Sequence, residues 1–373
     1  MKKFFSALAF VLTVACSTDD GSGVTPQPDD QAGFDRSAML SNWADNIIVP
    51  AYQAYSDQLD RLQTATAAFV EAPGTAQLAS LRTAWLDAYV AWQQVEMFEI
   101  GKAEEVSLRN YTNIFPTSAD EIEENIQQGT YTLELPSQND AQGFPALDYL
   151  LYGVADTDEA IVGRYTDATL GTSYQTYLSS VVQRMVELTE LVVSDWEGTY
   201  RDTFVANTGS SATASINKLA NDYLFYYEQI LRKGKVGLPA GVYSSTPLPE
   251  TVEGRYAGDV SKLLLEEALG ATQRFFNGQH FAGDAEGESF ASYLTYLNST
   301  RDGEDLVARI NAQFNSARQV SSSLNSSFEE QVRTNNQVLL TTYDELQRNV
   351  VLMKVDMFQA LNVKVDFVDN DGD

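Results

Sequence analysis

Apolar side chains recur at every third or fourth position along most of the chain, which is the period of an amphipathic helix. Two such series are separated by Pro73 and Gly74, a pair that favours a turn, so we predict two antiparallel helices joined there. The apolar positions of the two series are Tyr52, Tyr55, Leu59, Leu62 and Phe69, then Leu78, Leu81, Trp85, Ala88, Trp92 and Val95.

Three further series of this period predict helices in the rest of the chain. Their apolar positions are Tyr174, Leu178, Val181, Met185, Leu188 and Val192; Leu219, Tyr223, Tyr226, Ile230 and Leu231; and Val332, Leu339, Tyr343, Leu346, Val350, Met353, Met357 and Leu361. The last series predicts a helix over 330–362, which would be about 45–50 Å long. Strand-like alternation is scarce, so we expect an all-α fold made of two packed up-and-down helical bundles.

Glycine and proline interrupt the helical pattern in two regions, 101–142 and 234–258. In the first region we predict a long excursion with one short helix at 118–128, and long ordered loops of this kind are often functional. We expect the second region to cross the protein surface. A further boundary near 195–209 divides the predicted helices into an N-terminal bundle, 34–200, and a C-terminal bundle, 201–373.

The first sixteen residues have the layout of a secretory signal. Two lysines precede an apolar run, 4–15, that is too short to span a membrane, and the small Ala15 suits a cleavage site. Cys16, the only cysteine, would then begin the mature chain. This arrangement resembles the lipobox of bacterial lipoproteins, although Thr13 stands where leucine is more usual. We therefore predict a lipoprotein signal peptide over 1–16 with lipid on Cys16; an ordinary secretory signal is the alternative.

The segment 17–33 is rich in Gly, Ser, Thr, Pro and Asp and contains one bulky apolar residue, Val24. It cannot bury a core, so we predict a flexible tether between lipid and folded body. Its start, STDD, resembles the acidic signals that send some lipoproteins of the Bacteroidetes to the cell surface, and a solvated linker is the open alternative. The expected location is the cell envelope, anchored to the outer membrane and facing either the periplasm or the outside.

The charge balance excludes two classes of partner. The chain carries 24 Lys and Arg against 52 Asp and Glu, a formal charge of −28. Binding to nucleic acid or to anionic lipid headgroups needs a basic patch, so neither is expected. The excess negative charge would attract cations, although most such carboxylates are solvated helix faces.

The segment 142–153, QGFPALDYLLYG, resembles the signature region of the imelysin-like family (peptidase M75 and iron-regulated envelope lipoproteins). In that family a Gly-x-His-x-x-Glu motif opens a helix; the matching positions here are Gly143, Pro145 and Asp148. Segments at 83–101, around 218–262 and at the C-terminal end also resemble the family, so the likeness covers 34–373. The resemblance implies two four-helix bundles related by a pseudo-repeat, export to the envelope and a part in bacterial iron uptake.

The physical basis of the motif is that His at one position and Glu three residues later lie on the same side of a helix. The two side chains can share one metal ion, and imidazole with carboxylate suits iron or zinc. Pro145 cannot ligate a metal, although proline is well suited to the first turn of a helix. Asp148 keeps a carboxylate, either as a cation ligand or as a structural hydrogen-bond acceptor near the helix N-terminus.

Four other residues complete the predicted ligand-binding cleft around the motif. Glu96 lies four residues after Trp92 on a predicted helix and would point from the edge of the core into a cleft, whereas Trp92 itself is more typical of core. Glu253 and Tyr256 fall in the segment that matches the family's Glu-bearing region. The metal hypothesis takes Glu96, Asp148 and Glu253 as ligands of iron or another divalent cation. It requires the three carboxylates to converge.

Arg232, Lys233 and Lys235 form the densest positive cluster of this acidic chain. They could receive an anion such as a carboxylate-bearing iron chelate, or offset the negative carbonyl end of the preceding helix. We favour the second interpretation.

Catalytic equipment is scarce in the sequence. A metallopeptidase needs two or three metal ligands, an open coordination position and a general base, but the only histidine, His280, falls in a predicted loop, and no H-E-x-x-H motif is present. We therefore expect a non-enzymatic, envelope-anchored binding protein that passes iron or an iron chelate to an outer-membrane uptake partner. The alternatives are a scaffold protein that uses the same cleft for a peptide or protein without metal, and retained peptidase activity.

Overall fold

The computed structural model describes residues 33–367. The predicted signal peptide, the lipidation of Cys16 and the tether up to residue 32 lie outside the described residues. Almost all the described secondary structure is helical, which confirms the predicted all-α fold. The exceptions are a short antiparallel hairpin of β1 (Thr300–Arg301) and β2 (Glu304–Asp305) and an isolated bridge between Gln279 and Glu286.

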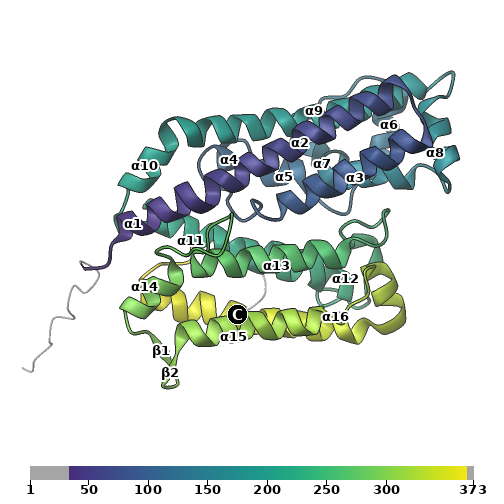
Figure 1. Ribbon diagram of the computed structural model, residues 1–373. Coiled ribbons are helices and arrows are strands. Elements are labelled where there is room, and N and C mark those ends of the chain that lie inside the picture. The colour runs from purple at the N-terminus through teal and green to yellow at the C-terminus, as the bar shows by residue number, and fades with distance from the viewer. Residues whose placement is uncertain (1–32, 368–373) are drawn as a thin grey trace, which may run out of the picture. The chain divides into compact units, whose positions relative to one another are not determined.

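The first layer is built on three long helices, in which α2 packs against both α3 and α9 (Figure 1). The predicted turn at Pro73 and Gly74 separates α2 from α3. The elements of this layer are α1 (Arg36–Ser41), η2 (Asn42–Ile48), α2 (Val49–Glu71), α3 (Thr75–Trp92), α4 (Lys102–Glu105), α5 (Leu108–Thr112), α6 (Ala119–Gln128), η3 (Pro136–Ala141), α7 (Gly143–Asp148), η4 (Tyr149–Gly153), α8 (Asp158–Tyr165), α9 (Gly171–Asp195), η5 (Trp196–Tyr200) and α10 (Arg201–Ala206).

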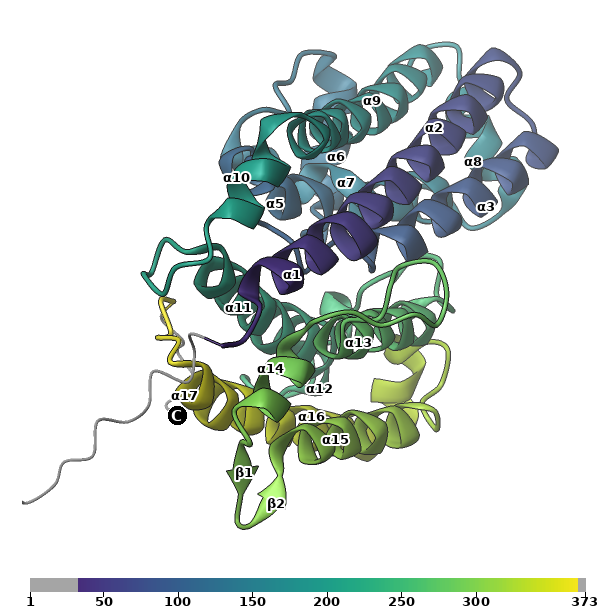
Figure 2. The same ribbon diagram turned by 60° about the vertical axis from the view of Figure 1, so that its left-hand side comes forward.

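The second layer places α16 against α15 and η6, with α13 packed on the same two elements (Figure 2). Its elements are α11 (Ser215–Phe225), η6 (Tyr226–Gly237), α12 (Leu238–Ala240), η7 (Pro249–Thr251), α13 (Ser261–Asn277), α14 (Phe290–Tyr296), α15 (Leu306–Ser321), α16 (Phe328–Val351), η8 (Leu352–Met357) and α17 (Phe358–Leu361). Here η3 and η7 are 3₁₀ turns and the other η elements are π-helical. The helix predicted over 330–362 is the run from α16 to α17.

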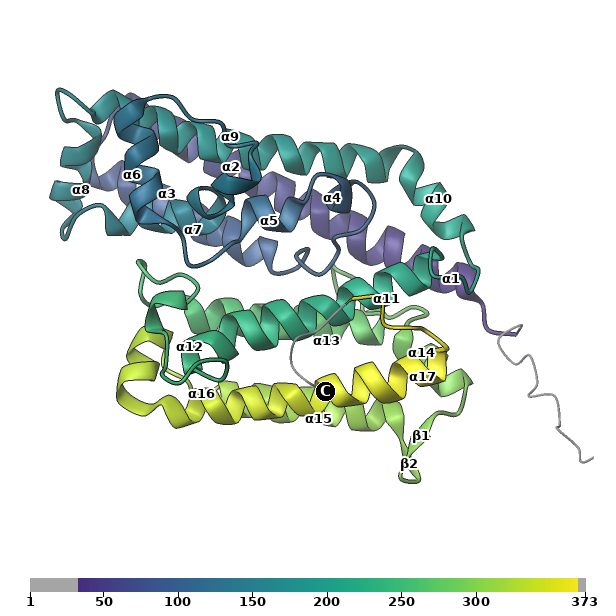
Figure 3. The ribbon, with the colours of Figure 1, turned by 180° about the vertical axis from the view of Figure 1, so that it is seen from behind.

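The two layers lie side by side, with the chain crossing between α10 and α11 (Figure 3). The described residues from Asp35 to Phe367 form one compact unit, in which α13 also contacts α3 across the layers. The division into bundles at residue 200 therefore stays a prediction. Among the described residues, no helix has both the length and the apolarity that crossing a membrane requires.

Local signals explain where the short helix of the excursion begins and ends. The Ser118 side chain accepts a hydrogen bond from the backbone N–H of Glu121, and Gly129 ends α6 in the left-handed region at φ 65°. Serine at the N-cap and glycine just past the last turn are the favoured residues at these two positions. The helix predicted at 118–128 is confirmed.

The aromatic core lies where the apolar series predicted it. Trp85 and Trp92 are fully buried in α3, with exposed fractions of 0% and 1%. The ring of Phe144, from α7, stacks on Tyr89 with centroids 4.3 Å apart. The apolar face of α3 thus packs against α7, the helix at the start of the signature region.

Candidate functional site

The signature helix α7 begins at a position that only glycine can occupy. Gly143 has φ +74°, and a Cβ there would lie 2.2 Å from the carbonyl oxygen of Thr112 at the end of α5. Pro145 is buried in the first turn, where its missing N–H leaves no hydrogen bond unmade. The conformation around the motif therefore needs no histidine.

Asp148 is held by backbone groups of a distant segment. Its Oδ2 accepts a hydrogen bond from the N–H of Tyr256 and its Oδ1 from the N–H of Ala257, both at 2.8 Å. The side chain is buried, and this burial raises the pKa of Asp148 to about 7 against the lowering effect of the two N–H groups. The Tyr256 ring packs edge-on against Tyr149, with centroids 5.2 Å apart. Asp148 thus fastens the segment 252–257 to the signature helix.

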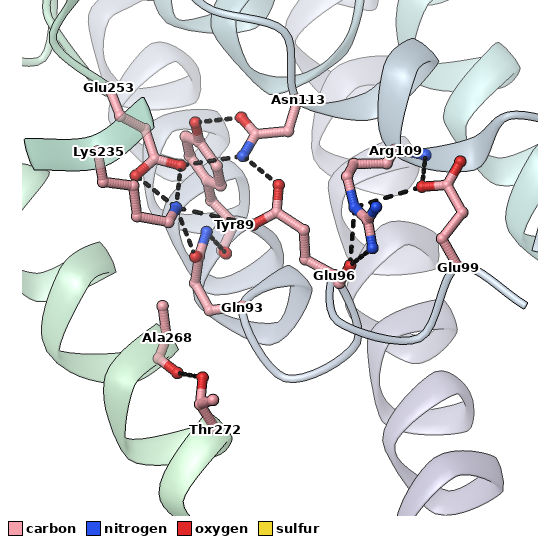
Figure 4. Close-up of polar contacts among 10 residues, drawn as sticks. All are labelled: Tyr89, Gln93, Glu96, Glu99, Arg109, Asn113, Lys235, Glu253, Ala268 and Thr272. Carbon is pink, nitrogen blue, oxygen red and sulfur yellow. Dashed lines mark hydrogen bonds and ion pairs between the residues drawn. The ribbon is translucent and has the colours of Figure 1, made fainter. Parts of the chain in front are cut away.

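A second group of polar side chains is buried between the layers (Figure 4), and we call it the buried ion cluster. It consists of Gln93, Glu96, Asn113, Lys235 and Glu253. The Lys235 Nζ lies 2.7 Å from both carboxylate oxygens of Glu253 and 2.9 Å from Gln93 Oε1. Its distance to Glu96 Oε2 is 3.7 Å. The ammonium is the centre of the cluster.

Asn113 joins the two carboxylates on their other side. Its Nδ2 donates to Glu96 Oε1 at 2.9 Å and to Glu253 Oε1 at 3.0 Å, while its Oδ1 accepts from the Tyr89 hydroxyl at 2.6 Å. Burial raises the pKa of Glu96; the charge of Lys235 opposes this rise and the charge of Glu253 adds to it. Gln93 and Glu96 follow α3 directly, whereas Lys235 belongs to η6, so the cluster ties the first layer to the second.

The prediction that the basic residues after Leu231 offset the end of a helix is wrong. The helix continues through η6 to Gly237 and then as α12. Arg232 is buried against Glu228, at 3.5 Å, and Lys235 lies in the buried ion cluster. Lys233 donates to Gln229 at 3.3 Å. Two of these cations are removed from water, and desolvated cations require carboxylate partners rather than a helix terminus.

Another buried cation, Arg109, links the turn after α3 to α11. Arg109 forms ion pairs with Asp222 at 3.0 Å and with Glu99 at 3.3 Å, and its guanidinium also donates to the carbonyl oxygen of Glu96. We call Glu99, Arg109 and Asp222 the Arg109 centre. Burial raises the pKa of Glu99 to about 7, against the lowering effect of Arg109. This centre has no signal in the sequence, because Asp222 lies 113 positions from Arg109.

The three predicted metal ligands do not surround one point. Glu96 and Glu253 meet at Lys235 and Asn113, whereas both oxygens of Asp148 face backbone N–H groups. Within residues 33–367, no group of three or more His, Cys, Asp or Glu side chains is arranged to hold a metal ion. The position between the two carboxylates already contains a positive charge. The residues present therefore do not fit a resident iron ion.

The cavity at the signature helix is small. It has a volume of about 10 Å³ and is lined by Pro145, Asp148 and Tyr256 among others, which is room for about one water molecule. Larger hollows lie elsewhere: one of about 490 Å³ between α2 and α9, and two of about 400 and 350 Å³ that share Glu104, Thr213 and Lys218. His280 lies in a separate cavity of about 20 Å³ beside Arg274.

The comparisons with known proteins agree with the fold. The family model described as imelysin, peptidase M75, matches residues 48–351. An imelysin-like protein from Psychrobacter arcticum 273-4 superposes with a TM-score of 0.67 at 17% identity, over 89% of this chain and 97% of that one. A putative iron-regulated protein A precursor from Parabacteroides distasonis ATCC 8503 gives 0.68 at 16% identity, over 90% and 97%.

A curated relative is similar over a shorter stretch. "Iron-regulated protein A" of Synechococcus elongatus is 24% identical over 117 residues, which are 31% of this chain. The match spans 32% of the relative's length, about a third. The match to the imelysin family model extends over most of the chain, through both helical layers and the signature region. The chain therefore belongs to the imelysin family.

Proposed function

We propose that this protein is a non-enzymatic binding protein of the cell envelope that takes part in the acquisition of iron as a preformed complex. Membership of the imelysin family and the partial similarity to an iron-regulated protein support the iron-related role. The predicted lipid anchor on Cys16 supports the envelope location. We infer that iron binds as a complex, because the predicted metal-binding side chains already form hydrogen bonds or ion pairs within the protein.

The observation that carries this proposal is that each residue predicted to ligate a metal already contacts another group of the protein. Pro145 offers no donor atom, Asp148 accepts two backbone hydrogen bonds, and the carboxylates of Glu96 and Glu253 flank Lys235. Hydrolysis would need an open metal position and a free general base, and the buried ion cluster offers neither. This supports a binding role rather than peptidase activity.

Charge and size favour a particular kind of complex. A protein with a net charge of −28 repels anionic chelates and attracts cationic ones, whereas a neutral chelate approaches without an electrostatic penalty. Cavities that enclose small molecules have volumes of about 300–1,000 Å³. The hollow between α2 and α9, lined by Ser, Thr and Gln side chains together with Ala and Val, falls within that range, whereas the signature cavity does not.

Equilibrium dialysis of the protein without its predicted signal peptide tests the proposal. The probes are Fe(II), Fe(III) and Zn(II) salts, anionic ferric citrate and a neutral ferric trihydroxamate. We expect retention of the neutral complex, and retention that persists in Asp148→Asn. Thr176→Trp, which fills the hollow between α2 and α9, reports whether the complex binds there. Failure to retain any iron complex would remove the iron role, and cleavage of a mixed peptide library with added zinc would refute the non-enzymatic role.

The second candidate function is a scaffold that binds a peptide or protein partner without metal. The closed cavity of about 10 Å³ at the signature favours it, because a partner can use the outer surface of the segment 252–257 without entering the protein. Purification from envelope extracts with and without a chelator separates the two functions. A partner recovered equally in both conditions, together with no retention of iron complexes, would favour the scaffold.

A further inference from the structure

The oxygen atoms around Lys235 form the kind of shell that a hard divalent cation takes. Glu253 presents both carboxylate oxygens at 2.7 Å from Nζ, Gln93 presents an amide oxygen at 2.9 Å, and Glu96 a further carboxylate oxygen at 3.7 Å. Mixed carboxylate and amide oxygens, with one bidentate carboxylate, are typical of Ca²⁺, Mn²⁺ and Mg²⁺ sites. The ammonium donates its three hydrogens into this shell.

Burial makes a cation at this point necessary. Lys235, Glu96 and Glu253 have exposed fractions of 1%, 1% and 2%. Two carboxylates so close together and so far from water carry a large desolvation cost unless a positive charge lies between them. The Arg109 guanidinium contacts the backbone carbonyl of Glu96 rather than its carboxylate. The ammonium of Lys235 is therefore the cation that faces both carboxylates.

Part of the oxygen shell is held in place independently of Lys235. Ser261 donates to the carbonyl oxygen of Glu253 at 2.8 Å, and Asp148 binds the next residues of the same segment, Tyr256 and Ala257. Asn113 spaces the two carboxylates from the opposite side. The segment that carries Glu253 and one oxygen of each carboxylate would therefore keep their hydrogen bonds if the ammonium were removed, which favours a preorganised ion site.

We propose that the Lys235 ammonium is a built-in cation occupying a divalent-cation site formed by Gln93, Glu96 and Glu253, and that removing it opens this site to Mn²⁺. The lysine stem reaches the site from η6, so the built-in cation also binds the second layer to Glu96 of the first. Four protein oxygens, with water completing the shell, suit Mn²⁺ better than zinc, which prefers nitrogen and sulfur ligands. This inference does not rest on the iron proposal.

The test compares Lys235→Ala with the unaltered chain in a Mn²⁺ titration, followed by electron paramagnetic resonance and thermal unfolding. We expect one Mn²⁺ per Lys235→Ala molecule, with a rise in its unfolding midpoint of roughly 5 °C or more at saturating metal. The unaltered chain should show neither change. Lys235→Ala combined with Glu253→Gln should lose the response.

Two further variants keep the outcome decisive. Lys218→Ala removes an ammonium that lies 3.4 Å from Glu104 at the exposed acidic surface, and should gain no stoichiometric Mn²⁺. Lys235→Met keeps most of the apolar stem and replaces Lys235→Ala in the Mn²⁺ titration if the alanine variant does not fold without metal. The proposal is overturned if neither Lys235 variant gives a Mn²⁺ response that Glu253→Gln abolishes. It is equally overturned if the unaltered chain binds Mn²⁺ through Glu253.

Discussion

The buried ion cluster and the Arg109 centre have the same charges but different surroundings. Each places one cation against two carboxylates, and each joins the turn after α3 to the helix of α11 and η6. At the Arg109 centre, the side chains of Glu99 and Asp222 line a cavity of about 400 Å³ and keep exposed fractions of 14% and 12%. At the buried ion cluster, Glu96 and Glu253 are sealed. Water can therefore compensate a missing charge at the Arg109 centre but not at the buried ion cluster.

The largest expected effect is the loss of the Lys235 charge. Lys235→Met leaves two carboxylates without their cation in a sealed site, and removing one partner of a buried ion pair costs about 3–5 kcal/mol of unfolding free energy. Arg109→Met should cost less, because Glu99 and Asp222 can be hydrated through the adjoining cavity. Urea unfolding of both variants measures the difference. Equal losses, or a larger loss for Arg109→Met, would remove the distinction between the two sites.

The pH dependence of stability sharpens the comparison at the Arg109 centre. The pKa of Glu99 rises from 4.5 to about 7 in the folded protein, so the folded state holds a proton that the unfolded state releases. Glu99 therefore makes the free energy of unfolding fall as pH rises from about 4.5 to about 7, by at most about 3 kcal/mol. Glu99→Gln should reduce this fall, as followed by urea unfolding across that range. An unchanged or steeper fall would contradict the assignment.

A smaller effect is expected from the residue that fastens the segment carrying Glu253. Asp148→Asn keeps the shape of the side chain but replaces one acceptor oxygen by an N–H₂ group that faces the N–H of Tyr256 or Ala257. Leaving a buried backbone donor without an acceptor costs about 1–3 kcal/mol. Hydrogen exchange of these two amides should accelerate in the variant. Unchanged exchange at both amides would show that Asp148 does not hold the segment.

The smallest effect is expected from removing the exposed charge of Lys218, which is the reference for the buried charges. Lys218 pairs with Glu104 at 3.4 Å, and the two side chains have exposed fractions of 43% and 59%. Exposed ion pairs contribute about 0–1 kcal/mol, so Lys218→Ala should change the free energy of unfolding by less than about 1 kcal/mol. A loss similar to that of Lys235→Met would mean that burial does not explain the difference between the charges.

The helical architecture could be predicted because its signals are local. Apolar spacing and the Pro73–Gly74 turn predict α2 and α3, and Ser118 with Gly129 bounds α6. The predicted helix end after Leu231 is wrong, because Gly234, a residue that commonly breaks helices, lies inside a helix that runs on to Gly237. The helix continues because its charged residues have buried partners. A local sequence pattern does not reveal such partners.

The candidate site was only partly predictable for the same reason. Glu96 was recognised because it extends the series Ala88 and Trp92 at four-residue spacing. Lys235 similarly continues the series of Tyr227 and Leu231, a signal of burial that the basic run around it obscured. Its partner Gln93 lies 142 positions away, and no spacing rule connects them. Buried ion pairs depend on tertiary packing, so a single sequence indicates their members but not their pairing.

The central claim is that the cation of the buried ion cluster is the protein's own Lys235 ammonium. Metal analysis of the unaltered chain after dialysis against Fe(II) and Mn²⁺ tests it most directly, with Glu253→Gln as the matched control. The account predicts no stoichiometric metal in either protein. One equivalent of metal in the unaltered chain that is lost in Glu253→Gln would contradict it.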